Sequence, residues 1–210
     1  CAFKDKKLSP PPKVYFKGNN KLIKKIKLSS KEGCSAYSAI SISNLNPKKK
    51  FPEKIRKSLK AAGIQSIHPL VDIVNFVMLE SGQPMHVFDL DKIVGDIEVR
   101  FAKPKETIKI LGEKDLKLAK DCLVIADDIE PIALAGISGG LNHSVSKKTK
   151  KFLIESAYFD PGAIKGRARR YGFQTDASQR FERGVDFNLH EEALKDVINI
   201  VQDIYQTDIS

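Results

Sequence analysis

The feature that most constrains the fold of this chain is the stretch from residue 152 to residue 186, where a short apolar run ends on one carboxylate. Phe-Leu-Ile at 152–154 leads directly into Glu155, and Asp-Pro-Gly at 160–162 then breaks the chain. An apolar run bounded by turn residues is typical of a buried strand. One acid at the mouth of such a strand, with small residues beside it and arginines nearby, indicates a site rather than a surface.

The second half of this stretch predicts a short helix. Asp176 can act as its N-cap, with Gln179 three residues later, and Gly184 can end it. An arginine-rich segment precedes the helix. The two halves of the stretch are therefore expected to converge near Glu155 and Thr175.

Composition limits the class of protein. A chain of 210 residues can form one large or two small domains, and 41% hydrophobic with 30% charged residues is typical of a soluble globular protein. No membrane-length apolar run and no signal peptide is present, which predicts a cytoplasmic protein without a membrane partner. The first residue, Cys1, indicates a piece of a longer polypeptide. With Cys34 and Cys122 it makes an odd, widely spaced set, which argues against a disulfide framework or a zinc site.

The formal net charge of +10, from 36 Lys and Arg against 26 Asp and Glu, has two interpretations. A polyanionic partner such as RNA is one, because phosphate contacts need cations. A lysine-rich surface that only keeps the protein solvated is the other, and net charge alone does not separate them. The lysine run 48–50 is expected to be a solvated helix entrance. The candidate RNA contacts are Lys147, Lys148, Lys150 and Arg167.

The first part of the chain is expected to contain both strands and helices. Residues 22–28 and 36–44 are predicted to form strands. Apolar residues at helical spacing over 55–62 predict a helix that ends at Gly63. Residues 70–80 are largely apolar and predict a buried helix. The proline run 10–12 ahead of these elements is typical of a linker.

Two polar residues in this part of the chain are candidates for a site. Asn75 lies within the predicted buried helix, and an unpaired buried amide costs about 1–3 kcal/mol, so Asn75 is either satisfied in the core or faces a pocket. Residues 83–89 are expected to form a loop. His86 within this loop has either a structural or a catalytic role.

From residue 96 onward the pattern changes to strands. Residues 97–101 alternate apolar and charged side chains, which predicts a half-exposed strand, and short runs up to residue 126 continue a meander. Residues 131–140 form an apolar strand that enters a glycine-rich bend, where backbone can approach a ligand closely. The bend matches no phosphate-binding or dinucleotide-binding motif, so it is either a tight turn or the wall of a pocket beside Glu155. A last amphipathic helix begins at Asn188.

Several segments, taken in order, carry a specific resemblance. They are Val71-Asp72-Ile73-Val74-Asn75-Phe76-Val77-Met78-Leu79-Glu80, Gly82-Gln83-Pro84-Met85-His86-Val87-Phe88-Asp89, Ala133-Leu134-Ala135-Gly136-Ile137-Ser138-Gly139-Gly140, Glu155-Ser156-Ala157-Tyr158-Phe159, and Thr175-Asp176-Ala177-Ser178 with Arg180-Phe181-Glu182-Arg183-Gly184-Val185-Asp186. In this order they resemble the B3/B4 module of the bacterial phenylalanyl-tRNA synthetase beta subunit, over about residues 34–190.

The resemblance implies a fold and a domain division. The fold is mixed α+β, with mostly antiparallel sheets packed in layers and flanking helices. Residues 34–210 would form the B3/B4 editing domain. Residues 1–33 would be a linker or the end of a preceding RNA-binding domain.

The resemblance also implies a function, because in that family this module hydrolyses tyrosine mistakenly esterified to tRNA(Phe). Glu155 would accept a hydrogen bond from the tyrosine hydroxyl beside the backbone of Gly136, and small residues would leave room for the ring. The implied substrate-binding residues are Glu155, Gly136, Gly139, Ala177 and Asn75, and the implied catalytic residues are His86 and Thr175.

The chemistry of such a site can be argued without the resemblance. Tyrosine and phenylalanine differ by one hydroxyl, and a buried carboxylate that accepts from it is left unpaired when phenylalanine enters, which can reject the analogue by about 10⁴–10⁵. The aminoacyl ester is already activated, so a positioned water can suffice. No G-x-S-x-G motif is present, and Thr175 or Ser178 has no evident partner base. His86 is expected to orient water or substrate, or to act as a general base.

The cofactors and partners follow from the same resemblance. This chain would need no cofactor, whereas the parent ligase would use ATP and Mg²⁺ and would combine this chain with an alpha subunit and tRNA(Phe). Two positions depart from the family pattern: Ser138 replaces a usual Met, and Gln65 replaces a frequent Arg. The alternative is a non-catalytic module that holds tRNA or the partner subunit. A free-standing editing protein is disfavoured by the missing initial Met and the proline-rich linker.

Overall fold

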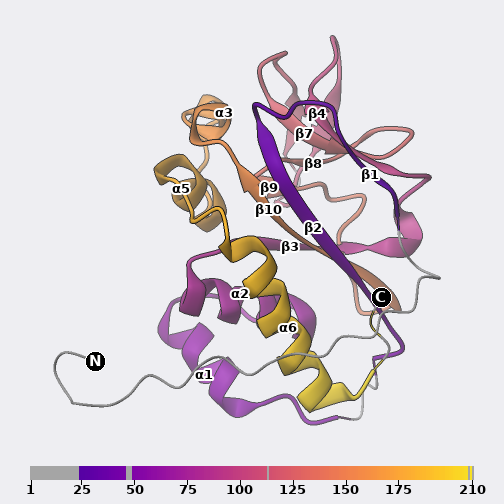
Figure 1. Cartoon of the computed structure of the whole chain (residues 1–210), viewed down its shortest axis with the longest axis vertical. Helices are drawn as coiled ribbons and strands as arrows, with labels where there is room; N and C mark the ends of the chain where they lie inside the picture. The colour runs from indigo at the N-terminus through magenta and orange to yellow at the C-terminus, as the bar shows by residue number, and fades with distance from the viewer. Residues whose placement is uncertain (1–23, 46–48, 113, 208, 210) are drawn as a thin grey trace, which may run out of the picture.

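The computed structural model describes residues 24–45, 49–112, 114–207 and 209. The predicted linker 10–12, the start of the first predicted strand and Lys48 lie outside these residues. The described chain forms three layers, in which helices cover one face of a three-stranded sheet and a five-stranded sheet covers the other (Figure 1). No described helix is both long enough and apolar enough to cross a bilayer.

The five-stranded sheet is mostly antiparallel. Its order is β1 (Ile26–Leu28), β4 (Ile97–Phe101), β7 (Leu123–Ala126), β8 (Pro131–Leu134) and β9 (Ser138–Gly139). Among the described strands of this sheet, only the pair of β1 and β4 is parallel. A small hairpin of β5 (Thr107–Lys109) and β6 (Asp115–Lys117) lies beside it, and Ile110 bridges to Gly140. The predicted meander and the strand that enters a glycine-rich bend are therefore confirmed.

The three-stranded sheet has the apolar strand of the 152–186 stretch at its centre. β10 (Lys151–Phe159) lies between β2 (Cys34–Ser43) and β3 (Met85–Asp89), antiparallel to both. The prediction of a loop over residues 83–89 is wrong, because residues 85–89 form β3 and hydrogen bond to β10. The strand is short and its partner lies more than 60 residues away, so local sequence carried little signal for it.

The helices predicted near residues 55–62 and 70–80 are present, and a glycine follows or ends each of them, as predicted. Three of the described helices pack on the outer face of the three-stranded sheet: α1 (Glu53–Ala61), α2 (Pro69–Ser81) and α6 (Leu189–Tyr205). Gly63 follows α1 at φ +74°, and Gly82 ends α2 at φ +84°. The short helices after β10 are α3 (Pro161–Ile164), α4 (Arg167–Arg170) and α5 (Asp176–Arg183), and a single turn, η2 (Leu90–Lys92), follows β3.

The start of α5 differs from the prediction. Thr175, not Asp176, is the N-cap: its hydroxyl accepts from the amide of Ser178, and the Ser178 hydroxyl accepts from the amide of Thr175. Asp176 is the first helical residue, and Gln179 takes no part in the cap. Threonine and aspartate are both good N-caps, so residue type alone did not select between them.

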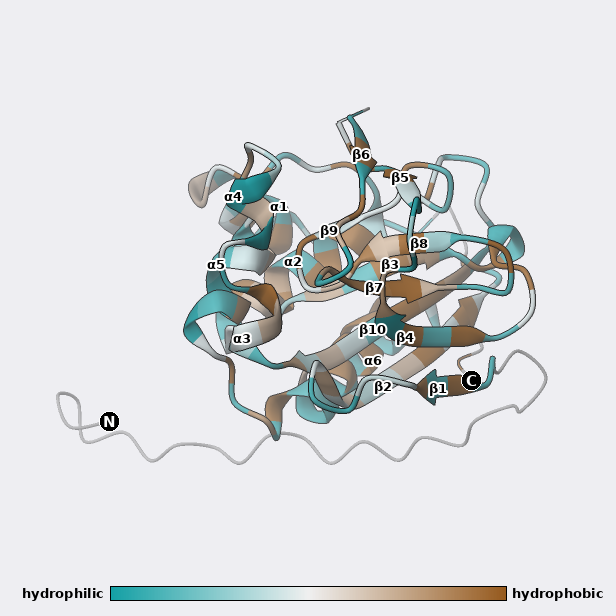
Figure 2. Cartoon of the chain, turned by 90° about the horizontal axis from the view of Figure 1, so that it is seen from above, coloured by the Kyte–Doolittle hydropathy of each residue, from teal (hydrophilic) through white to brown (hydrophobic). Residues whose placement is uncertain are grey.

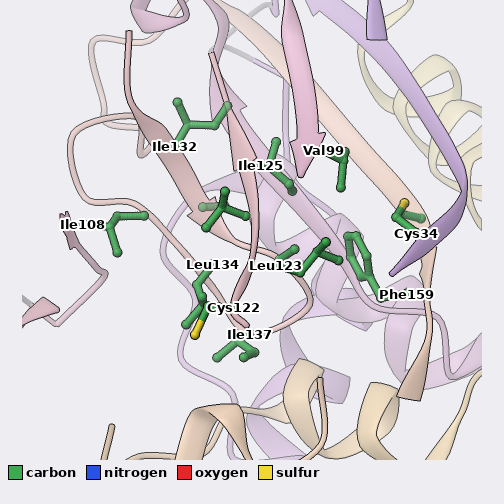
Figure 3. Close-up of a cluster of buried hydrophobic side chains, with 14 of the residues drawn as sticks. Cys34, Val99, Ile108, Cys122, Leu123, Ile125, Ile132, Leu134, Ile137 and Phe159 are labelled. Carbon is green, nitrogen blue, oxygen red and sulfur yellow. The ribbon is translucent and has the colours of Figure 1, made fainter. Parts of the chain in front are cut away.

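Two apolar cores lie on the two faces of the three-stranded sheet. Side chains alternate along β10, so Phe152 and Ile154 pack toward the helices while Leu153 and Phe159 pack toward the five-stranded sheet. Figure 2 shows apolar residues gathered on the inner strands and polar residues on the surrounding loops and on α4. Figure 3 shows part of the core between the sheets, with Val99, Leu123 and Phe159 directed into it. Glu155, in phase with Leu153, points into this same layer.

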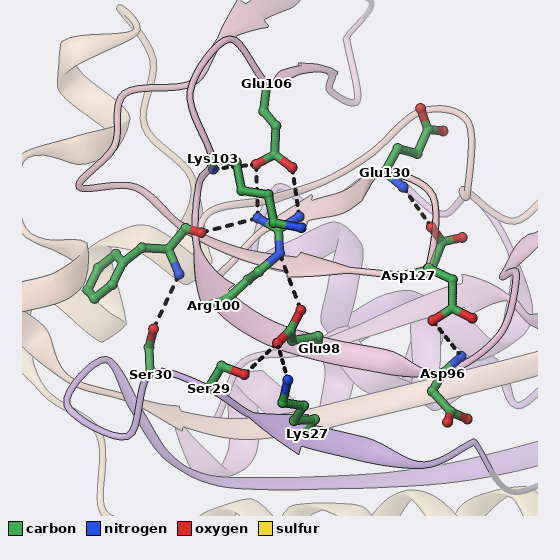
Figure 4. A network of polar contacts seen from close by, with 12 residues as sticks. Lys27, Ser29, Ser30, Asp96, Glu98, Arg100, Lys103, Glu106, Asp127 and Glu130 are labelled. Carbon is green, nitrogen blue, oxygen red and sulfur yellow. Dashed lines mark hydrogen bonds and ion pairs between the residues drawn. The ribbon is translucent and has the colours of Figure 1, made fainter.

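The predicted half-exposed strand 97–101 is more buried than its alternation suggested. Arg100 is only 8% exposed. Its guanidinium makes two hydrogen bonds to Glu106, at 2.9 and 2.7 Å, and lies 3.5 Å from Glu98 (Figure 4). These two carboxylates compensate the buried charge and tie β4 to the loop that follows it.

Candidate active site

Glu155 lies in the middle of β10, between the two sheets. It is 4% exposed, and its neighbours across the ladder are His86 on β3 and Ala39 on β2. Facing residues of an antiparallel pair project to the same side, so Glu155 and His86 point together toward the five-stranded sheet. Burial raises the pKa of Glu155 to about 8 and lowers that of His86 to about 4. Both side chains are therefore uncharged at pH 7.

The raised pKa of Glu155 predicts a pH-dependent stability. Folded Glu155 keeps its proton up to about pH 8, whereas the ordinary value is 4.5, so the free energy of unfolding falls as pH rises through this window. Glu155→Gln removes this loss. We expect the unfolding free energy of the variant, relative to wild type, to increase by roughly 3 kcal/mol between pH 4.5 and pH 7, at about 1.4 kcal/mol per unit.

Denaturant unfolding of both proteins across this pH range measures that difference. Subtraction cancels the opposite contribution of His86, whose depressed pKa makes stability fall as pH drops from 6.5 to 4 in both proteins. A difference that stays constant from pH 4.5 to pH 8 contradicts the raised pKa of Glu155.

His86 lies against Gly139 of β9. A Cβ atom on Gly139 would come within 2.2 Å of Nε2 of His86, so only glycine leaves room for the imidazole in this position. The ring also stacks edge-on against Phe88, with centroids 4.5 Å apart. Its Nε2 is buried and has no hydrogen-bond partner among the described residues. Such a nitrogen is free to bind a ligand that enters beside it.

The glycine bend between β8 and β9 forms the opposite wall. Gly136 has φ +66°, a conformation that favours glycine. A Cβ atom at this position would lie only 3.0–3.2 Å from the side chains of Phe159, Ile164 and Phe181. The hydroxyl of Thr175 donates to the carbonyl of Ile137 at 2.8 Å. This bond ties the beginning of α5 to the bend and so fixes the wall of the site.

Two adjoining cavities open between these elements. The inner cavity, about 60 Å³, has room for a few water molecules, and the outer cleft is about 510 Å³. The residues that line only the inner cavity are Glu155, Gly136, Phe181, Ile125, Ala133 and Leu134. Those that line only the outer cleft include Asn75, Thr175, Asp176, Lys114 and Phe173. The residues that line both are Pro84, Met85, His86, Ile137, Ser138, Gly139 and Ala177. The cavities therefore connect at His86, Gly139 and Ala177.

The structure thus brings together every predicted substrate-binding and catalytic residue. Asn75 lies on α2, half-buried, and lines the outer cleft, so the alternative in which it faces a pocket is the one the structure supports. Thr175 also lines that cleft, although its hydroxyl already donates to Ile137 and accepts from Ser178. Among the described residues, no three His, Cys, Asp or Glu side chains gather to hold a metal ion.

The predicted RNA contacts lie elsewhere. Lys147, Lys148 and Lys150 line a third cleft that shares no residue with the two cavities around Glu155. Arg167 lies at neither place, since its Nε is 3.3 Å from the carboxylate of Asp121 and its Nη1 donates to the carbonyl of Lys165. The four predicted residues therefore do not form one surface.

Two residues of the site were missed by sequence reasoning. Tyr37 on β2 is half-buried beside the site and lines neither cavity. Burial and then the neighbouring Glu155 raise the pKa of its phenol, and its buried hydroxyl has no hydrogen-bond partner among the described residues. Its position opposite Ala157, two residues from Glu155, could have been inferred only with the strand register known. Lys114 places a cation at the outer cleft and lies 5.8 Å from the ring centroid of Phe173. Nothing in its local sequence marked it.

Comparison with known proteins identifies the family. The model of the B3/4 domain matches residues 33–206. The chain belongs to the B3/4 domain family. It is 46% identical, over 89% of its length, to the phenylalanine–tRNA ligase beta subunit of Psychrobacter arcticus, of which it covers 23%. It is 43% identical, over 94% of its length, to that of Photorhabdus laumondii, of which it covers 25%. The chain therefore spans about a quarter of the length of these curated relatives.

A solved structure has the same fold. It is an N-terminal fragment of the phenylalanyl-tRNA synthetase beta subunit from Pyrococcus horikoshii, with a TM-score of 0.57 over 94% of this chain and 52% of that one. The two sequences are only 13% identical, so the likeness concerns the fold alone. It confirms the predicted mixed α+β class, and the B3/4 match confirms the resemblance.

Proposed function

We propose that this B3/4 domain hydrolyses the aminoacyl ester of tyrosine wrongly attached to tRNA(Phe), as the editing part of a cytoplasmic phenylalanine–tRNA ligase. One observation carries the proposal: a buried, uncharged carboxyl group, Glu155, lines an inner cavity that adjoins a larger cleft. A carboxyl group with an ordinary structural role in an apolar layer would have a protein partner. The relatives that match most of the chain are beta subunits of this ligase.

In this proposal, Glu155 recognises tyrosine by a hydrogen bond to its hydroxyl group. With its pKa near 8, the carboxyl is protonated at pH 7 and can both donate to and accept from a phenol. Phenylalanine in the same place leaves the buried carboxyl without a partner, so phenylalanine binds more weakly than tyrosine.

The ring of tyrosine would lie between His86 and Ala177, where the two cavities connect. The inner cavity is small, so it admits the hydroxyl end of the ring while the ester and the RNA terminus remain in the outer cleft. Gly139 and Ala177 provide the width of this passage, because a larger side chain at either position fills it. Asn75 and Lys114 then face the ester and the first phosphate.

Water is the nucleophile in the proposed reaction. It attacks the ester carbonyl carbon, the bond from that carbon to the ribose oxygen breaks, and the ribose oxygen takes a proton to leave as a hydroxyl. His86 orients the water or the ester through its free Nε2, because a pKa near 4 makes the imidazole a weak base. Thr175 acts through the bend it holds, since its proton is engaged by Ile137.

The remaining partners follow the ligase assignment. The ligase would combine an alpha subunit with this chain, and ATP and Mg²⁺ would serve its synthetic site. No residue of this chain is proposed to bind them.

Filling the passage tests the proposal. Ala177→Trp places an indole where the substrate ring would lie, and we expect it to reduce hydrolysis of tyrosyl-tRNA(Phe) at least a hundredfold while aminoacylation continues. The measurement is release of labelled tyrosine by the assembled ligase that carries this chain, with phenylalanyl-tRNA(Phe) in parallel. Ala61→Trp, the same change at an exposed position of α1 that lines none of these cavities, is the matched control.

The results separate the proposal from a module that only holds RNA or a partner subunit. Wild-type enzyme that clears the tyrosyl ester, with loss confined to Ala177→Trp, supports editing in this pocket. Equal hydrolysis by wild type and Ala177→Trp would place the chemistry elsewhere. It would favour the alternative hypothesis of a non-catalytic module.

A further inference from the structure

A third cleft, called here the basic cleft, lies on the far face of the three-stranded sheet from Glu155. Its volume is about 860 Å³. Two parts of the chain that are distant in sequence line it together: residues 44–45 with 49–51, and the loop 147–150. The lining residues are Asn44, Leu45, Lys49, Lys50, Phe51, Arg56, His68, Pro69, Lys147, Lys148, Thr149, Lys150, Phe152 and Tyr205.

The lining is strongly cationic. The described residues that line the basic cleft include five lysines and one arginine and no aspartate or glutamate. None of these six cations makes an ion pair with a described residue, whereas nearby Lys151 pairs with Asp91 at 2.9 Å. Arg56 instead lies 5.5 Å from the ring centroid of Phe51. Six cations around one concave surface repel one another, and an anionic ligand relieves that repulsion.

The floor of the basic cleft is preorganised. His68 caps α2 by accepting the amide of Leu70 at its Nδ1, so its Nε2 carries the proton and can donate to a ligand. Its ring lies 5.1 Å from that of Phe152. Thr149 donates to Asp89, which holds the lysine loop against the end of β3. A donor and apolar rings at the floor, with cations around the rim, suit a ligand that has both phosphate and base.

The basic cleft is separate from the pocket around Glu155 but close to it. Phe152 and Glu155 lie on opposite faces of β10, so the two sites open on different sides of the sheet. Along α2, Pro69 lines the basic cleft and Asn75 lines the outer cleft, which is a separation of about 9 Å at 1.5 Å per residue. One RNA molecule is long enough to occupy both.

We propose that the basic cleft binds the phosphate backbone of RNA, at a segment of the tRNA other than its aminoacylated 3′ end. The identity of the RNA rests on the proposed function, whereas the preference for a polyanion rests on the cleft itself. This explains why the predicted RNA-contacting lysines lie apart from Glu155: they hold the body of the molecule while its end enters the pocket. It also gives Lys49 and Lys50 a binding role in place of the solvated helix entrance predicted from sequence.

Reversal of the charge of two lysines in the basic cleft tests this site, because RNA binding can be measured without hydrolysis. The probe is fluorescein-labelled tRNA(Phe) that lacks its last three nucleotides and so cannot enter the pocket around Glu155. We expect Lys147→Glu with Lys148→Glu to weaken its binding to the 210-residue chain about tenfold or more. The slope of log affinity against log salt should fall by about one to two, as expected for two lost phosphate contacts.

The matched control reverses two exposed lysines that line none of the clefts, Lys31→Glu with Lys117→Glu. It changes net charge equally and should bind the probe within twofold to threefold of wild type. Equal weakening by both pairs overturns the site, because it reduces binding to net charge, and so does unchanged binding by the Lys147 and Lys148 pair. Tyrosyl-tRNA hydrolysis is measured separately, so failure of editing and failure of this cleft give different results.

Discussion

Glu155→Ala should abolish the selective hydrolysis of tyrosyl-tRNA(Phe). Among the described residues, the carboxyl is the only ionisable group that lines the inner cavity besides His86, and its loss removes the contact proposed to distinguish tyrosine from phenylalanine. We expect the ratio of tyrosyl to phenylalanyl hydrolysis to fall by about 10³ or more, because a site built to hydrogen bond a hydroxyl discriminates by about 10⁴–10⁵. Single-turnover deacylation of both esters by the assembled ligase measures the ratio.

Glu155→Gln sharpens this test. If Glu155 acts in its protonated form, as its pKa near 8 predicts, the neutral amide can replace it and the variant should retain selectivity within about tenfold of wild type at pH 7. If the ionised carboxylate is required, Gln should fail as fully as Ala. A Glu155→Ala enzyme that still clears tyrosine and spares phenylalanine would remove Glu155 from the specificity site.

Gly139→Ala should have the second largest effect, because its new methyl group collides with the imidazole of His86. The built Cβ lies 2.2 Å from Nε2, so the ring must rotate out of the passage. Gly139 does not have a positive φ, so the substitution acts through this contact and not through backbone strain. We expect tyrosyl-tRNA hydrolysis to fall about 10² or more, in the range of a lost orienting or general-base group.

A double mutant establishes the mechanism of that loss. His86→Ala alone should lower hydrolysis to a similar extent, and adding Gly139→Ala to it should cost little more, because the displaced ring is then absent. Ser58→Ala, at a half-buried position of α1 that lines neither cavity, serves as the control. Fully additive losses would mean that Gly139 contributes by another route than the position of His86.

Local sequence was sufficient for the elements whose signals are strong. The apolar run before Glu155, the helical spacing before Gly63 and the apolar helix before Gly82 all predicted the observed strand and helices. It failed where a partner far along the chain decides the conformation. Residues 85–89 look like a loop on their own, and they form a strand because the backbone groups of β10 are available beside them.

The beginning of α5 shows the same limit at the level of single atoms. Threonine and aspartate both occur as N-caps, and here Thr175 is the N-cap, because its hydroxyl also donates to Ile137 across the site. That contact exists only when the β8–β9 bend lies beside α5. The candidate site residues were recognised by motif, but their joint geometry required the register of β3 against β10.

By itself the sequence determined the kinds of element, the family resemblance and the presence of one acid inside an apolar strand. Only the tertiary structure decided what surrounds that acid: His86 from β3, the glycine bend and α5 are separated in sequence and meet through long-range strand pairing and packing. It also separated the lysines of residues 147–150 from Glu155 and placed them opposite Lys49 and Lys50. The physical reason is that burial, and with it the pKa of Glu155, depends on neighbours in space and not on neighbours in sequence.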